Sequence, residues 1–384
     1  MTRALFAASL LMLGWTYIGY PLAMWARARF APRHVDAANW EPRIDVVVVA
    51  HNAAGEIAAK LDNLRTLDYP VDRLHIHVAS DGSEDLTAAL LQECTDPRVR
   101  TYLFPQRRGK SACLGDIIPQ LDGEIVVFAD VRQRLETDAI RALLRPLADA
   151  EVGAVSGELM FERADSDFAD GVDFYWRYEK LIRRNEAASG SVVGVTGALY
   201  AARRALLPAV PPGLILDDLW IPLEIARRGA RIAFAADARA WDRPSADAAL
   251  EAQRKRRTLA GNFQLIAREP ALLLPWSHPL GWRLWGHKWL RLLAPWFLSI
   301  MLATNVLLAP TSTRWLILLL AQAGFYGAAI AGLWTPTLLR HLPVRIAATF
   351  VRMNGYAIVG LFDFLSGRSA HLWSVTRHTD TSPP

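Results

Sequence analysis

The clearest pattern along the chain is a series of short apolar runs that each end in polar residues. Ile44–Ala50 and Leu74–Ser80 are followed by polar turns, and Ile125–Ala129 runs straight into Asp130. Continuous apolar runs bounded by turn residues are typical of strands buried on both faces, as in parallel sheets. Further strands are predicted at Val99–Phe104, Val152–Glu158, Val192–Tyr200 and Arg231–Ala235.

Between these strands, apolar residues recur at helical spacing. In Ala53–Leu67, for example, Ile57, Leu61 and Leu64 fall on one helix face. Further helices are predicted at Asp85–Cys94, Ser111–Leu121, Phe168–Arg184, Leu216–Arg228 and Ala246–Ile266. Strands that alternate with helices form βαβ units around a mostly parallel sheet. The pattern therefore predicts an α/β, Rossmann-like domain over residues 40–268.

Longer apolar segments flank this domain on both sides. Ala4–Trp25, Leu292–Leu308 and Trp315–Trp334 are each long enough to cross a bilayer. Val344–Leu365 is also apolar but contains two arginines, an asparagine and an aspartate, which are costly at the bilayer centre. For that segment, a membrane crossing and a half-buried helix both stay open.

Four tryptophans beside histidines and basic residues mark a segment just before the second apolar stretch. This mixture favours the lipid headgroup layer, although an ordinary core helix is the alternative. The predicted organisation is a transmembrane helix at 1–28, the α/β domain at 40–268, an amphipathic interfacial segment at 271–290, a transmembrane region at 291–366 and a polar tail at 367–384.

Composition and charge agree with a mixed chain. Hydrophobic residues make up 52% and the mean hydropathy is +0.14, which suits a globular part plus a few spans. The net charge is +5, but the basic residues flank apolar segments and accompany no nucleic-acid-binding motif. We therefore interpret the excess as membrane-surface charge. Cys94 and Cys113 have no metal-ligand spacing and are expected to be reduced thiols.

The arginines after the first apolar segment predict its orientation. One basic residue precedes Ala4–Trp25, whereas Arg27, Arg29, Arg33 and Arg43 follow it. The positive-inside rule then places the α/β domain in the cytosol, as in an integral protein of a bacterial-type inner membrane. A cleaved signal peptide is the competing interpretation, but the apolar region is too long for one.

Acidic residues gather where ligands bind in open α/β sheets, beyond the carboxyl ends of the strands. Asp81 and Asp130 end strands, and Asp217-Asp218 open a helix after a Pro/Gly loop. Turn formation explains Asp81 alone, and helix capping explains Asp217-Asp218 alone. Together they favour a binding site. Lys110 beside Gly109 is a candidate for phosphate oxygens, although the P-loop spacing is absent.

An ordered set of motifs resembles the family 2 glycosyltransferases across the whole predicted α/β domain. The segments are AHN (50–52), LDYPVDRLHIHVASDGSEDLT (67–87), RRGKSACL (107–114), GEIVVFAD (123–130), GVTGALYAARR (194–204), LDDLWIPL (216–223) and QRKRR (253–257). Together with the flanking spans, they look like the membrane-bound branch of cellulose, hyaluronan and poly-N-acetylglucosamine synthases. The resemblance implies a GT-A fold.

For the donor, the resemblance implies a nucleotide-sugar site at the edge of the sheet. Residues Ala50, His51, Asn52 and Asp81 would hold the uracil and ribose of a UDP-sugar, with Lys110 near the nucleotide. Asp130 matches the first carboxylate of the family's metal-binding D-x-D motif. It would bind Mg²⁺ or Mn²⁺ together with the diphosphate.

For transfer, the resemblance assigns a base and an acceptor site. Asp218 matches the last position of the family's T-E-D motif, the general base. Asp217 lies beside it at the acceptor and diphosphate end. Gln253 and Arg256 match the Q-x-x-R-W motif, which closes over the diphosphate and acceptor, and Arg257 takes the place of its tryptophan.

Three departures from the family pattern change the expectations. Arg132 stands where D-x-D has its second acidic or amide residue, which leaves metal use open. Ala53 replaces the glutamate usual after the loop asparagine. Arg257 replaces the tryptophan on which an acceptor sugar would rest, which leaves acceptor binding open.

The sequence thus predicts an inverting glycosyltransferase that moves a sugar from a UDP-sugar to a lipid-linked or growing glycan acceptor at the membrane. Two alternatives remain: a single-addition enzyme that makes a glycolipid, and a catalytically weak, nucleotide-sugar-binding membrane subunit of a synthase complex. The donor sugar, the linkage, the oligomeric state and any synthase partner subunits are left open.

Overall fold

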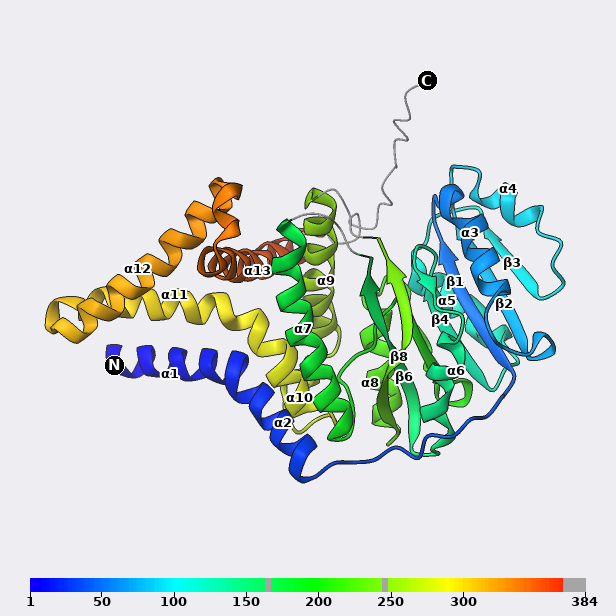
Figure 1. The fold of residues 1–384 in the computed structure, drawn as a ribbon, viewed down its shortest axis with the longest axis horizontal. Coiled ribbons are helices and arrows are strands. Elements are labelled where there is room, and N and C mark those ends of the chain that lie inside the picture. The colour runs from blue at the N-terminus through cyan, green and yellow to red at the C-terminus, as the bar shows by residue number, and fades with distance from the viewer. Residues whose placement is uncertain (163–166, 244–247, 369–384) are drawn as a thin grey trace, which may run out of the picture. The chain divides into compact units, whose positions relative to one another are not determined.

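The computed structural model describes residues 1–162, 167–243 and 248–368, which fall into two compact units (Figure 1). A helical unit contains Met1–Arg33, Arg163–Val193 and Ile266–Ser366. A sheet unit contains His34–Glu162 and Gly194–Leu265.

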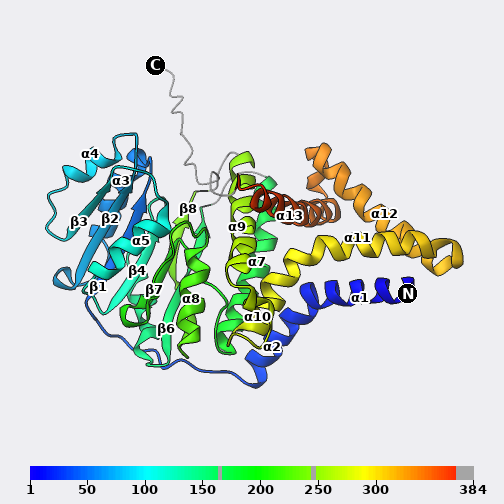
Figure 2. The same cartoon turned by 180° about the vertical axis from the view of Figure 1, so that it is seen from behind.

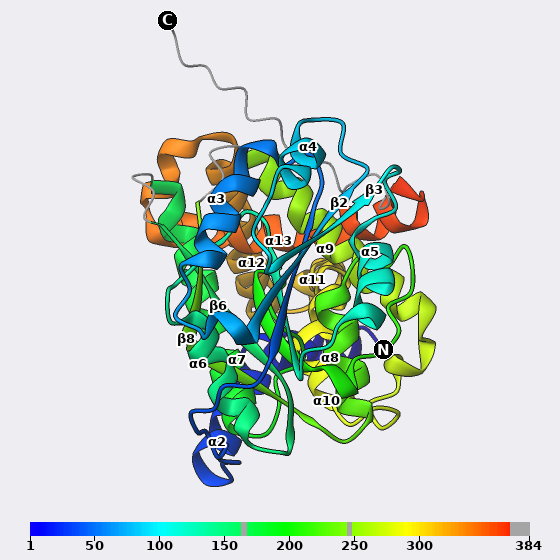
Figure 3. The ribbon, with the colours of Figure 1, turned by 90° about the vertical axis from the view of Figure 1, so that its right-hand side faces the viewer.

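The sheet unit is built on one eight-stranded sheet with the order β3-β2-β1-β4-β7-β6-β8-β5. Its strands are β1 (Ile44–Ala50), β2 (Leu74–Asp81), β3 (Val99–Phe104), β4 (Ile125–Asp130), β5 (Arg134–Leu135), β6 (Val152–Phe161), β7 (Leu199–Arg203) and β8 (Arg231–Asp242). The strands β3, β2, β1 and β4 run parallel to one another. Strand β7 is antiparallel to both of its neighbours, β4 and β6. Strands β6 and β8 are parallel, and β5 is antiparallel to β8. Figure 3 shows their twist. The predicted, mostly parallel α/β fold is confirmed.

Helices cover this sheet between the strands. They are α3 (Ala54–Arg65), α4 (Thr87–Gln92), α5 (Lys110–Ile117), α6 (Ala139–Leu144), α8 (Asp217–Arg227) and α9 (Ala248–Arg268), whose last residues belong to the helical unit. Every residue of β1 is buried, and Ile57, Leu61 and Leu64 of α3 lie in the same core. The continuous apolar strand and the periodic helix face therefore pack as their patterns predict.

The prediction of a strand at Val192–Tyr200 is wrong over most of its length. The strand there, β7, begins only at Leu199, and the preceding residues form an irregular loop. In that loop the amide of Val195 donates to the carbonyl of Asp218 (3.1 Å), and the amide of Thr196 donates to Ser156 Oγ (3.1 Å). The amides of Val195 and Thr196 therefore find their hydrogen-bond acceptors without pairing as a strand of the sheet. An apolar run can then be buried here as a loop.

The helical unit contains the apolar segments found in the sequence. Its helices are α1 (Thr2–Gly14), α2 (Tyr20–Phe30), α7 (Asp167–Ala188), α10 (Gly281–Leu284), α11 (Leu290–Leu308), α12 (Thr313–Trp334) and α13 (Leu342–Leu365), with π-helical turns at Trp15–Gly19 and Trp285–Trp289. Figure 2 shows the same helices from behind. By length and composition, the continuous helical stretches Thr2–Phe30, Gly281–Thr311 and Thr313–Trp334 are able to cross a membrane.

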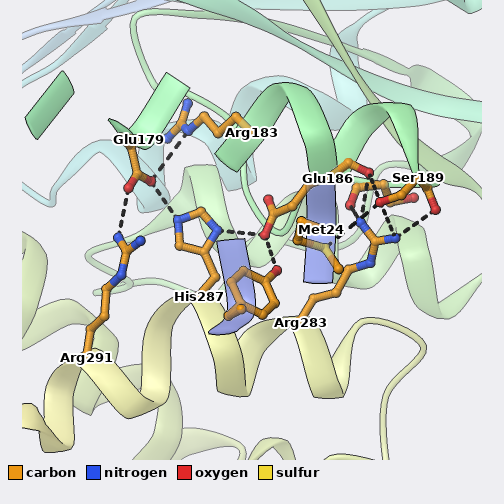
Figure 4. A network of polar contacts seen from close by, with 10 residues as sticks. Met24, Glu179, Arg183, Glu186, Ser189, Arg283, His287 and Arg291 are labelled. Atoms are coloured by element: carbon orange, nitrogen blue, oxygen red, sulfur yellow. Dashed lines mark hydrogen bonds and ion pairs between the residues drawn. The ribbon is translucent and has the colours of Figure 1, made fainter. Parts of the chain in front are cut away.

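A buried polar network joins α7 to the segment around His287 (Figure 4). His287 Nε2 lies 2.6 Å from Glu179 Oε1, and its Nδ1 lies 2.8 Å from Glu186 Oε1. Glu186 also accepts from the hydroxyl of Tyr20, and Glu179 accepts from Arg291 Nη1 at 2.8 Å. Buried charges require partners of this kind, so the network fixes how these helices meet.

Two further features show how tightly these helices pack. Arg283 is buried and donates to the backbone carbonyls of Glu186, Ser189 and Ser191. Gly286 has to be a glycine, because a Cβ there would lie 2.0 Å from the ring of Tyr20. The apolar pattern does not predict this close approach.

The two halves of the predicted interfacial segment, 271–290, differ in how deeply their side chains are buried. Trp276 is 79% exposed, whereas Trp289 is 1% exposed and packs inside the helical unit. Its second half therefore contributes to the core of this unit, which was the alternative to an interfacial helix. Contact of the exposed first half with a membrane surface stays a prediction.

Candidate active site

Hydrogen bonds join the loops that follow the carboxyl ends of β1 and β2. His51 Nδ1 lies 2.7 Å from the carbonyl oxygen of Asp81, and Asn52 Oδ1 accepts from the amide of Glu84 at 2.8 Å. Asn52 adopts a left-handed backbone with φ +48°, which asparagine tolerates better than most residues. Ala50, the last residue of β1, is 1% exposed. The predicted nucleotide loop is therefore a defined structure rather than a loose turn.

Asp81 is fully buried and organises the next loop. Its two carboxylate oxygens accept from the amides of Arg108 (2.7 Å) and Gly109 (2.8 Å). Gly82, with φ +58°, must be a glycine, since a Cβ would lie 2.2 Å from the amide nitrogen of Arg107. Asp81 thus shapes the loop that leads to Lys110. Its direct contact with a ribose stays a prediction.

Lys110, the first residue of α5, reaches across to two acidic residues. Its Nζ lies 2.9 Å from Asp130 Oδ1 at the end of β4 and 3.3 Å from Asp217 Oδ2 at the start of α8. Burial alone would lower the pKa of Lys110, but Asp130, Asp217 and Asp218 outweigh it and raise that pKa above its usual value. Residues far apart in the sequence therefore meet around one ammonium group.

Asp218 and Asp130 both lie close to Gly197. A Cβ at Gly197 would lie 3.5 Å from Asp218 Oδ2 and 3.6 Å from Asp130 Oδ2. The hydroxyl of Tyr200 is buried nearby and has no hydrogen-bond partner among the described residues. Burial and the charges of Asp217, Asp218 and Asp130 raise the pKa of this phenol.

Three residues that were not predicted for the site, Lys60, Gln133 and Asp242, hold the loop after Asp130. Arg132 is ion-paired with Asp242 at the end of β8, and Gln133 Nε2 donates to the same carboxylate at 2.9 Å. The buried Lys60 of α3 donates to the carbonyl of Gln133 at 2.7 Å. Asp242 ends a strand just as Asp81 and Asp130 do, and that signal was available in the sequence.

Helix α9 carries the remaining predicted residues, Gln253, Arg256 and Arg257, which are half-buried. Its position is fixed by Gln264, which accepts from the amide of Ile215 (3.0 Å) and donates to the carbonyl of Gly213 (2.9 Å). These contacts join α9 to the loop that leads into Asp217. The roles of the three residues toward an acceptor or a diphosphate stay predictions.

The metal site implied by the D-x-D resemblance does not fit these side chains. Among the described residues, no group of three or more His, Cys, Asp or Glu side chains could hold a metal ion. One oxygen of Asp130 already binds Lys110. Arg132 carries no lone pair for a metal and is paired with Asp242. Asp130 is therefore the only D-x-D position with a ligand oxygen.

Comparison with known proteins decides the family. Residues 42–261, more than half of the chain, match the model of "Glycosyltransferase like family 2". The chain belongs to this family. The family assignment made from the motifs is confirmed, whereas the cellulose and hyaluronan synthase-like branch stays a prediction.

Curated relatives of this glycosyltransferase family 2 chain match it in part. An N-acetylglucosaminyltransferase of Rhizobium meliloti (strain 1021) is 29% identical over 175 residues, 44% of this chain and 41% of that protein. A beta-monoglucosyldiacylglycerol synthase of Synechocystis sp. is 27% identical over 124 residues, 30% of this chain and 25% of that protein. The chain spans less than half the length of these relatives.

A solved structure resembles nearly the whole chain. It is a mannosyltransferase from Pyrobaculum calidifontis in complex with GDP-Man and Mn²⁺, with a TM-score of 0.70 and 25% identity. The match covers 95% of this chain and 99% of that one. It confirms the GT-A fold with helices at both ends.

Proposed function

We propose that this family 2 protein is an inverting glycosyltransferase that moves a sugar from a nucleotide-sugar, a UDP-sugar by resemblance, to an acceptor hydroxyl at the membrane. The observation that carries the proposal is the meeting of Lys110, Asp130, Asp217 and Asp218 at the carboxyl edge of the sheet. Ligands of open α/β sheets bind at this edge, and an acidic base beside a cation suits transfer from a diphosphate.

In the proposed reaction, the acceptor oxygen attacks the anomeric carbon of the donor sugar. The bond between that carbon and the diphosphate oxygen breaks, and its electron pair stays on the diphosphate. Asp218 takes the acceptor's proton, a role worth roughly 10²–10⁴-fold in rate. Lys110 lies where it would meet the charge that develops on the leaving group.

The helices and the relatives support the acceptor part of the proposal. The three helical stretches able to cross a membrane would bring a lipid-linked or growing glycan acceptor to the protein. Relatives named for N-acetylglucosamine transfer and for glycolipid synthesis support this class of acceptor. An inner-membrane location with the sheet unit in the cytosol, where nucleotide-sugars are made, belongs to the same proposal.

The need for a divalent metal is a separate part of the proposal. The Mn²⁺ bound to the mannosyltransferase neighbour favours Mg²⁺ or Mn²⁺ here, with Asp130 as the ligand. The side chains around Asp130 argue against this ion, because Lys110 holds one oxygen of Asp130 and Arg132 offers no ligand atom. The second candidate function, a catalytically weak nucleotide-sugar-binding subunit, is favoured by Arg132 alone, because it replaces the second D-x-D ligand.

The proposal is tested with the purified full chain in detergent. UDP-glucose, UDP-N-acetylglucosamine and GDP-mannose are compared by thermal shift, because a ligand that binds only the folded state raises its melting temperature. At least one is expected to do so, and to be hydrolysed or transferred when membrane lipid extract is added. Binding without turnover would favour the binding subunit, and no binding by any donor would contradict the proposal.

A further inference from the structure

One carboxylate oxygen of Asp130, the D-x-D residue that would bind a metal ion, is already paired with a cation of the protein itself. Lys110 Nζ lies between Asp130 Oδ1 at 2.9 Å and Asp217 Oδ2 at 3.3 Å, and the Lys110 side chain is only 17% exposed. A divalent ion bound to Asp130, whose side chain is 41% exposed, would therefore lie close to a largely buried ammonium group. Like charges at such short range repel each other, and partial burial strengthens the repulsion.

The remaining D-x-D position strengthens this conclusion. The guanidinium of Arg132 is neutralised by Asp242, whose side chain is buried. The same Asp242 accepts from Gln133, and Lys60 fixes the Gln133 carbonyl. A rotation of Arg132 that made room for a metal would leave Asp242 buried without its cation, which is costly.

We infer that Lys110 is the built-in counter-charge for the donor's diphosphate and that sugar transfer by this protein needs no divalent metal. The inference rests on the proposed function. When the donor binds, Lys110 exchanges one carboxylate partner for a diphosphate oxygen. When the anomeric carbon–oxygen bond breaks, the electron pair left on the diphosphate faces this ammonium, and the acceptor's proton goes to Asp218.

Two binding measurements, neither of which needs turnover, test whether the protein requires a divalent metal. Binding of UDP and of GDP to the full chain is measured by calorimetry in EDTA and in Mn²⁺, and Mn²⁺ binding to the protein alone is measured by electron paramagnetic resonance. One of the two nucleotides is expected to bind with similar affinity in both buffers, and the protein alone is expected to bind no stoichiometric Mn²⁺.

Variants then test the lysine. Lys110→Met is expected to weaken nucleotide binding in EDTA by about tenfold or more, the usual cost of one charge-assisted hydrogen bond. Lys110→Arg should recover part of the loss. Arg100→Met removes a charge on β3, where Arg100 contacts Gln120, and should leave binding unchanged. If Lys110→Met unfolds, Lys110→Met with Asp217→Asn removes the uncompensated buried carboxylate, and its nucleotide affinity is compared with that of Asp217→Asn alone.

The outcomes separate this inference from the proposed function. Nucleotide binding that appears only with Mn²⁺, or a stoichiometric Mn²⁺ site lost in Asp130→Asn, overturns the inference and leaves the proposed function standing. Unchanged binding by Lys110→Met in EDTA also overturns it. Binding of neither nucleotide in either buffer overturns the proposed function and the inference together.

Discussion

At the scale of single residues, Asp218 carries the proposed chemistry, and its replacement gives the most direct test. Asp218→Asn keeps the shape of the side chain but cannot accept a proton. Turnover should fall by about 10²–10⁴-fold while donor affinity changes by no more than a few-fold. Steady-state rates and calorimetry on the same preparation measure both quantities.

Asp217 is the matched control for that prediction, because it is the adjacent carboxylate on the same helix turn. It is 5% exposed and paired with Lys110, so Asp217→Asn should affect donor binding more than the proton transfer. Turnover close to wild type in Asp218→Asn would remove Asp218 from the mechanism.

Lys60 gives a prediction about pH. Burial lowers its pKa to about 7, although the charge of Asp130 opposes the shift. In the unfolded chain a lysine holds its proton up to about pH 10.4, so between these values the unfolded state binds more protons. The free energy of unfolding should therefore rise with pH from 7 to 10, by at most about 1.4 kcal/mol per unit from this residue.

Lys60→Met should remove this contribution and flatten the dependence, as measured by denaturant unfolding followed by tryptophan fluorescence. Lys180→Met, a lysine of the helical unit, is the control and should keep the wild-type slope. Equal slopes for wild type and Lys60→Met would show that Lys60 is not buried as a neutral amine.

Some residues of the site could be predicted from their place at the end of a strand or the start of a helix, whereas the pairing of others depends on how distant elements pack. Asp81, Asp130 and Asp218 were predicted because each stands at the end of a strand or the start of a helix. The partners Lys60 and Asp242 come from elements far away in the chain. No local pattern specifies such pairings, because they depend on how α3 and β8 pack against the loop after β4.

At the scale of elements, the strands buried on both faces were the most predictable. Ile44–Ala50 has the expected bounds, because a continuous apolar run has few alternatives once it is buried. Val99–Phe104 also has the expected bounds, although it is a partly exposed strand at the edge of the sheet. The two-residue strand β5 and the short helix α6 were not predicted. Elements this short have too few residues to show a period.

The polar network around His287 leads to a prediction about how stably the helices pack. His287→Leu would leave Glu179 and Glu186 facing each other in the core of the helical unit. Breaking a buried ion pair in this way costs about 3–5 kcal/mol, so the melting temperature should fall by several degrees. Differential scanning fluorimetry in detergent measures the shift.

His341→Leu is the matched control, because His341 is an exposed histidine of the same unit and exposed substitutions usually stay within about 0.5 kcal/mol. A melting temperature for His287→Leu equal to that of this control would mean that the two glutamates find other partners at little cost.

At the scale of the whole molecule, the sequence predicted a sheet domain at 40–268 between helices, whereas helix α7 within that range belongs to the helical unit. The apolar segments were predictable because a membrane crossing demands a length that soluble helices seldom reach. The ambiguous segment Val344–Leu365 became α13, in which Asn354 and Asp363 are buried within the helical unit. Hydropathy alone cannot tell burial against other helices from burial in lipid.

Orientation in the membrane is the prediction for the whole chain. If Thr2–Phe30 crosses the bilayer with its following arginines inside, the sheet unit is cytosolic. The stretches Gly281–Thr311 and Thr313–Trp334 then form a hairpin whose turn, at Ser312, lies on the outer side. In a protein with Cys94 and Cys113 replaced by serine, Ser312→Cys should react with an impermeant thiol reagent in intact cells.

The cytosolic control is Asp62→Cys, because the side chain of Asp62 on α3 is 73% exposed and should be labelled only after the cells are broken. Both sites are exposed in the structure, so a difference in labelling reports the side of the membrane rather than burial. Labelling of Asp62→Cys but not Ser312→Cys in intact cells would invert the orientation. The site around Lys110 and Asp218 would then face away from the cytosolic pool of nucleotide-sugars, and the proposed donor would have to be replaced by a lipid-linked sugar.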